Sequence, residues 1–188
     1  RLSNACWKVT GGDVLLHDNA EYSLIESSSL HVTEGSFVTE SSVSILLDDS
    51  QAFINGGNFI IQDQSSISLR NGASVDVSKG NAIFSGFVSA NVLDSEFSVS
   101  GGFVEFSGAA NLDWQSSLLT VSAGNMNIKG KSVVSFLDSK ILVSGGSIRF
   151  DDESVITVDS SSFDVYIGSV SFLGKTKVTF SDAKLDIS

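Results

Sequence analysis

The sequence predicts an all-β fold, a right-handed parallel β-helix (β-solenoid) of eight coils with three strands per coil. Three observations predict it: a glycine recurs every 22 or 23 residues, apolar and polar residues alternate in three stretches of each interval, and no stretch has the spacing of an amphipathic helix. The recurrent glycines are Gly12, Gly35, Gly57, Gly80, Gly102, Gly124, Gly146 and Gly168. Because such repeats bury a core only by stacking on their neighbours, we expect one elongated unit.

Residues 1–10 precede the repeat and do not follow its pattern. We expect them to form an N-terminal cap or linking segment in which Trp7 covers the open end of the first coil, because terminal units of repeat proteins are usually atypical. Residues 11–188 then form the parallel β-helix of eight coils. Each coil is numbered here so that its recurrent glycine holds position 2.

Each coil contains three alternating stretches, which we predict to be its strands. Their inward residues hold positions 4 and 6, 12 and 14, and 19 and 21, because alternation with period two is typical of a half-buried strand. In the third coil these residues are Phe59 and Ile61, Ile67 and Leu69, and Val75 and Val77. A coil of 22 residues is longer than the roughly 18 of the left-handed hexapeptide helix, which favours right-handed winding.

The corners between the strands carry small or turn-forming residues. Position 8 is Asp, Ser or Gly in every coil, which predicts a left-handed backbone there. Position 17 is always Ser or Ala, which predicts a cramped inward corner where the hydroxyl bonds the local backbone. Position 1 is Gly in the odd coils and position 16 is Asp in the even coils, so the true unit is a pair of coils.

The composition narrows the function. There are 22 acidic and 11 basic residues, a net charge of -11, so we expect no nucleic-acid partner. No apolar run approaches the roughly 20 residues of a membrane span. Cys6 is the single cysteine and cannot form an intrachain disulfide.

Position 16 offers the first candidate for chemistry, because stacked carboxylates bind calcium. Its aspartates are Asp49, Asp94, Asp138 and Asp182. Occurring in every second coil, they stand about 9.6 Å apart, whereas calcium needs oxygens within roughly 2.6 Å. We therefore interpret the column as a solvated corner in which Ser relieves like-charge repulsion, and expect no metal and no cofactor. Two denser clusters leave the metal alternative open: Asp48-Asp49 and Asp151-Asp152-Glu153.

The repeat resembles the pectin-lyase-like superfamily of right-handed β-helices, which includes pectate lyases, polygalacturonases, phage tailspikes and many surface adhesins. The resemblance covers residues 11–188 and is architectural. Enzymes of that group cluster carboxylates with Arg, Lys or His under long corner loops. No coil here has a long insertion, the two histidines lie on different faces, and neither Arg70 nor Arg149 has a repeated acidic partner on its own strand. We therefore expect no catalytic residue and no enzyme.

The expected function is that of an extracellular or cell-surface structural or adhesive β-solenoid, part of a filament, stalk or surface layer. The alternative is a carbohydrate-active or carbohydrate-binding β-helix. A third reading is an ice-binding solenoid, although the outward row at positions 11 and 13 is polar without being uniformly Thr. The outward position 22 carries a hydroxyl residue in every coil but the second, which has Asn55. This column adds glycans to the candidate partners.

Two apolar surfaces predict self-association. The outward position 5 is apolar in the first four coils, and we expect this stripe to pack on the N-terminal segment or on a neighbouring molecule. Its members are Leu15, Val38, Ile60 and Ile83. The last coil should expose three strand edges together with Phe172, Phe180 and Leu185. We expect this end to pair with further coils or a cap of the same parent chain, or with the first residues of another subunit, which would yield a filament.

Overall fold

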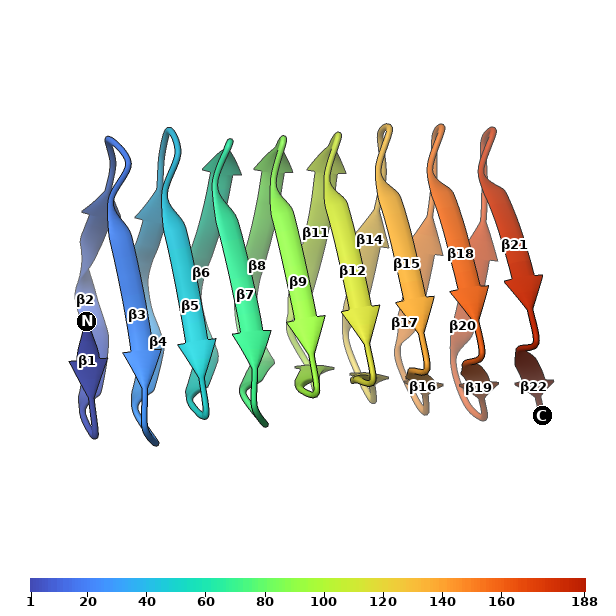
Figure 1. Cartoon of the computed structure of the whole chain (residues 1–188), viewed down its shortest axis with the longest axis horizontal. Coiled ribbons are helices and arrows are strands. Elements are labelled where there is room, and N and C mark those ends of the chain that lie inside the picture. The colour runs from blue at the N-terminus through green and yellow to red at the C-terminus, as the bar shows by residue number, and fades with distance from the viewer.

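A computed structural model describes all 188 residues, and it is a rod of stacked β-coils without any helix (Figure 1). Every strand pair is parallel, and the strands form one nine-stranded and one 13-stranded sheet. The predicted all-β solenoid of eight coils is therefore confirmed. The strands are β1 (Leu2–Ser3), β2 (Cys6–Leu16), β3 (Glu21–Ile25), β4 (Ser29–Thr39), β5 (Ser44–Asp48), β6 (Gln51–Asp63), β7 (Ser66–Arg70), β8 (Ser74–Gly86), β9 (Ser89–Leu93), β10 (Glu96–Val99), β11 (Phe103–Gly108), β12 (Asn111–Gln115), β13 (Leu118–Val121), β14 (Asn125–Ile128), β15 (Val133–Leu137), β16 (Lys140–Val143), β17 (Ser147–Phe150), β18 (Val155–Asp159), β19 (Ser162–Val165), β20 (Ser169–Phe172), β21 (Lys177–Ser181) and β22 (Lys184–Ile187).

The winding is right-handed. In Figure 1 the chain advances from left to right while the near, nine-stranded sheet runs downward and the strands behind it run upward. This is the direction that twisted parallel strands favour for a crossover.

The coils stack in register. A β-carbon built on Gly57 would meet the carbonyl oxygen of Gly35, one on Gly80 that of Gly57, and one on Gly102 that of Gly80. The recurrent glycines therefore form one column along the rod, as predicted. At this corner the even coils turn through a positive φ, for example +76° at Gly35 and +78° at Gly124, so the two-coil alternation is also a backbone alternation.

The larger sheet is undivided at one end and divided at the other. In β4, β6 and β8 the third strand of one coil runs on into the first strand of the next, giving strands of 11 to 13 residues. Beyond β8 the sheet splits into two branches, which begin with β10 and β11. Three separate strands per coil thus describe the second half of the rod, and the glycine corner is a bulged continuation in the first half.

The interior is one apolar cluster of 44 buried residues. The first strand contributes one buried phenylalanine to each coil from the second to the fifth, and the second strand contributes the buried Trp114 and Phe136 to the fifth and sixth. Phe84 and Phe106 stack with centroids 4.4 Å apart, and Trp114 and Phe136 stack at 5.1 Å. Burial of this apolar cluster stabilises the fold by roughly 25 cal/mol per Å² of apolar surface removed from water.

Residues 1–10, for which we expect a cap or linking segment, pair with the first coil as half of a preceding coil. Leu2 lies opposite Leu24, and Trp7 lies opposite Leu30. The Trp7 ring packs on Tyr22 with centroids 5.1 Å apart, so it covers the apolar end of the first coil. Burial raises the pKa of the Tyr22 hydroxyl, which has no hydrogen-bond partner.

The corners behave as the residue types predict, with one addition. All eight residues at position 8 have positive φ, from +58° at Asp18 to +96° at Gly86. Position 16 also has positive φ in every coil, from +46° at Asp182 to +60° at Ser27, although its mixture of Asp, Ser and Asn did not by itself predict this. Asp and Asn tolerate this conformation better than most residues, so the backbone gives a second reason for the aspartates of this column.

The buried corner generates the first prediction. Ser117→Leu should lower the free energy of unfolding by about 1–3 kcal/mol through overpacking, because Ser117 is buried. Asp94→Ser should change it little, since Ser116 and Ser160 adopt the same left-handed backbone one coil and three coils further on. Urea denaturation midpoints of the two variants provide the measurement, and the opposite order would refute this assignment of the corner.

The glycine column generates the second prediction, tested by two substitutions that share a backbone angle. Gly124 and Gly72 have φ of +78° and +77°, so Ala at either should cost about 1–2 kcal/mol of backbone strain. A β-carbon at Gly124 would also lie 2.2 Å from the Gly102 carbonyl oxygen, whereas none lies within 4 Å at Gly72. Gly124→Ala should therefore be clearly the more destabilising in thermal melts, and equal losses would contradict the stacking.

Candidate functional site

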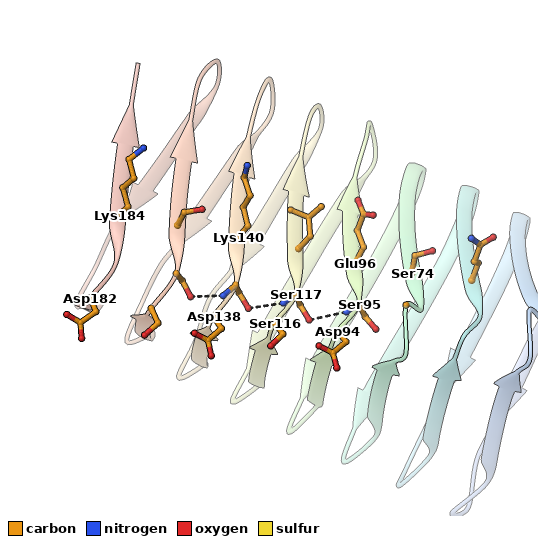
Figure 2. A pocket seen from close by; sticks show the side chains of 17 residues that line it. Ser74, Asp94, Ser95, Glu96, Ser116, Ser117, Asp138, Lys140, Asp182 and Lys184 are labelled. Atoms are coloured by element: carbon orange, nitrogen blue, oxygen red, sulfur yellow. Dashed lines mark hydrogen bonds between the residues drawn. The ribbon is translucent and has the colours of Figure 1, made fainter.

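The largest hollow on the surface is a shallow groove of about 930 Å³ that follows the third corner along the rod (Figure 2). It is formed by positions 16, 17 and 18 of successive coils, and Leu118 is the only hydrophobic residue among the 17 that line it. The groove exists because each coil turns through a left-handed residue at position 16 and then places a small residue inward at position 17.

A ladder of serines forms the floor of this groove. The amide of Ser95 donates to Ser117 Oγ at 3.2 Å, that of Ser117 to Ser139 Oγ at 3.2 Å, and that of Ser139 to Ser161 Oγ at 2.9 Å (Figure 2). Each hydroxyl also donates to a carbonyl two residues back, as Ser117 does to Gln115 at 2.6 Å. These hydroxyls satisfy the corner backbone, as predicted, and are not free nucleophiles.

The walls of the groove carry charges. Asp94, Asp138 and Asp182 line one side, while position 18 supplies Lys140 and Lys184 to the other. Lys140 lies 3.7 Å from Asp164, and Lys184 lies 3.2 Å from Asp186. The hydrogen bond and charge of Asp186 raise the pKa of Lys184. Such a surface can donate and accept hydrogen bonds along its length.

The densest polar cluster joins the second and third coils. Arg70 donates to Asp48 Oδ2 through Nε at 2.9 Å, and Asn71 donates to Asp48 Oδ1 at 2.6 Å. The Asn71 and Arg70 hydrogen bonds hold the pKa of Asp48 below its usual value. Arg70 has no acidic partner on its own strand, but Asp48 lies 22 residues earlier at the same coil position. This coincidence of coil position is the sequence signal for the pair.

The remaining candidate residues do not converge. His17 contacts the adjacent Asp18 at 2.6 Å, and His31 stacks on Phe53 with ring centroids 4.8 Å apart. Arg149 pairs with Asp151. This hydrogen bond lowers the pKa of Asp151 most, and a second hydrogen bond from the Asp152 amide lowers it further. No group of three or more His, Cys, Asp or Glu side chains is placed to hold a metal ion.

The apolar stripe is a single row of side chains on the 13-stranded sheet. Leu15 lies opposite Val38, Val38 opposite Ile60, and Ile60 opposite Ile83, after which Glu105 continues the row. Leu15 is 52% exposed, and the other three are half-buried by their neighbours. Residues 1–10 stack on the end of the first coil and do not cover the stripe, so of the two expected occupants only a neighbouring molecule stays a prediction.

The last coil exposes its inward column. Phe172, Phe180 and Leu185 are 41%, 40% and 51% exposed, whereas Phe150, one coil earlier, is fully buried. Phe172 stacks on Phe150 with centroids 5.2 Å apart. Leu185 lies opposite Phe163 in the same way, so the exposed side chains continue the core of the rod.

Comparison with known protein families, curated proteins and solved structures gives no match for this chain. The fold and the geometry of the site are therefore described from the sequence and the structure of this chain alone. No segment forms a helix long and apolar enough to cross a membrane.

The Asp48 cluster generates the third prediction. Because its folded pKa is depressed, Asp48 stabilises the fold above the ordinary carboxyl pKa of 3.8, and this contribution is lost as pH falls through the lower folded pKa. For a partly exposed pair it should be below about 1 kcal/mol.

Denaturation at neutral pH and again below pH 3.8 measures this contribution. Asp48→Asn should be less stable than the unaltered chain at neutral pH and should lose less stability on acidification. Asp113→Asn, which changes an exposed residue of β12, serves as the control. An Asp48→Asn variant with the acid sensitivity of the unaltered chain would contradict the assignment.

Proposed function

We propose that this chain is a non-catalytic structural or adhesive segment of an extracellular or cell-surface β-solenoid with the architecture of the pectin-lyase-like superfamily. One observation carries the proposal. No connection between consecutive strands exceeds four residues, so no inserted loop rises from any coil to wall a cleft. Such a rod acts by spanning a distance and by presenting a long surface of repeated outward side chains, as other solenoids do.

The charges of the outer faces also support a structural role. Glu105 pairs with Lys129 of the next coil at 3.0 Å, and Lys175 pairs with Glu153 of the preceding coil at 3.5 Å. Each pair bridges neighbouring coils. An acid or base poised for catalysis is instead held close to a second reacting group in a cleft that excludes water.

Carbohydrate binding is the second candidate, favoured by the polar groove of the third corner. Its hydroxyls, carboxylates and amines repeat along the axis over several coils, which suits an extended polymer with many hydrogen-bonding groups better than a compact ligand. The groove lacks the aromatic platforms that would strengthen such binding. We therefore rank it below the structural role.

The fourth prediction tests the proposal against the enzymatic alternative. The purified chain should release no reducing ends from a panel of soluble and insoluble polysaccharides. Co-sedimentation with the insoluble members of the panel separates an adhesive role from a purely structural one. Sustained release of oligosaccharides, abolished by a substitution in the groove such as Asp138→Asn, would overturn the non-catalytic assignment.

The fifth prediction concerns self-association through the stripe. Ile60→Asp and Asn127→Asp both place a carboxylate at position 5, the first within the stripe and the second in the polar half of the same column. If a second molecule packs on the stripe, Ile60→Asp lowers the mass measured by light scattering at high concentration and Asn127→Asp does not. Equal masses for both variants and the unaltered chain would remove the stripe as an interface.

A further inference from the structure

The chain contains two Asn-Gly sequences, Asn55-Gly56 and Asn71-Gly72, both at corners of the rod. In an Asn-Gly dipeptide the backbone nitrogen of Gly reaches the side-chain carbonyl carbon of Asn readily, because Gly has no β-carbon to obstruct the approach. The nitrogen gives up its proton and bonds to Asn Cγ, the Cγ–Nδ2 bond breaks, and the side-chain nitrogen leaves as ammonia. Water then opens the succinimide ring to Asp or to isoaspartate, whose main chain runs through the former side chain.

The fold holds Asn71-Gly72 away from this reaction. The Asn71 side-chain amide donates to Asp48 Oδ1 at 2.6 Å, which fixes the carbon that would be attacked. The Gly72 nitrogen donates to the Asp94 carbonyl oxygen at 2.8 Å, so the attacking atom is engaged with the next coil.

Asn55-Gly56 lies in a different environment. Both residues are exposed, and they sit in the bulge of β6, where Asn55, Gly56 and Gly57 have no register partner on β4 and the register toward β8 shifts. The register partner of Asn55 on β8 is Lys79, whose positive charge favours the amide anion that attacks. In contrast, the half-buried Asn58 and Asn81, neither of which precedes a glycine, are joined by an amide hydrogen bond of 2.9 Å.

We propose that Asn55-Gly56 is a site of spontaneous deamidation in the folded rod, whereas the fold protects Asn71-Gly72. The two products differ in their effect. Asp at position 55 faces Lys79 and is accommodated. Isoaspartate lengthens the main chain where a β-carbon on Gly56 would lie only 2.6 Å from the Thr33 carbonyl oxygen, so it loosens the stacking of this corner on the corner before it.

The test incubates the full chain in mildly alkaline buffer, folded and in urea, and quantifies deamidation of the two tryptic sites over time by mass spectrometry. In urea both sites should react at similar rates. In the folded chain Asn71 should react at least about tenfold more slowly than Asn55, because reaction waits for local opening. Labelling by an isoaspartyl methyltransferase identifies the isoaspartate product.

Two variants sharpen the comparison. Asn55→Ser, which installs the residue found at the same coil position in the next four coils, should abolish the fast reaction. Asp48→Ala, checked for folding by circular dichroism, should raise the rate at Asn71 and leave that at Asn55 unchanged. Equal rates at the two sites of the folded chain, or faster reaction at Asn71, would overturn the proposal.

Discussion

Each coil depends on its neighbours for its backbone hydrogen bonds, and this axial pairing is the constraint from which the other features follow. The chain makes 134 backbone hydrogen bonds, and they continue through the corners, as where Lys129 donates to Phe106 at 2.9 Å and Lys131 to Gly108 at 2.7 Å. Corners and strands must therefore keep the same spacing of about 4.8 Å. A residue that widens one corner disturbs the ladders on both sides of it.

That spacing accounts for the choice of corner residues. A turn that stays within one coil height needs left-handed backbone at two points of every coil, and the chain supplies Gly, Asp, Asn or Ser there. Asp at position 8 has a further use, because its carboxylate accepts the corner amide one coil earlier: Asp63 from Ser41 at 2.9 Å, and Asp152 from Gly130 at 3.0 Å. These hydrogen bonds stabilise the corner.

The sequence alone predicted the strands, their inward columns and the small-residue corner at position 17. Each of these patterns recurs in all eight coils at an interval of 22 or 23 residues. The sequence was insufficient where one residue acts once. The Asp48–Arg70 contact occurs in a single pair of coils, and the merging of strands in β4, β6 and β8 depends on backbone angles that residue types leave open. Residues 1–10 lack the recurrent glycine, yet Trp7 and Val9 alternate like an inward pair, which was the available sign of their pairing with the first coil.

The apolar stripe coincides with the undivided half of the larger sheet, since its four residues lie on β2, β4, β6 and β8 and the row turns polar at β11, where the sheet has divided. Val and Ile favour extended backbone, so at Val38, Ile60 and Ile83 strand propensity alone explains an apolar outward residue. These three are half-buried. Leu15 is not β-branched and is more than half exposed, so neither propensity nor burial accounts for it. Leu15 is therefore the member of the stripe whose exposure a contact with a second molecule would explain.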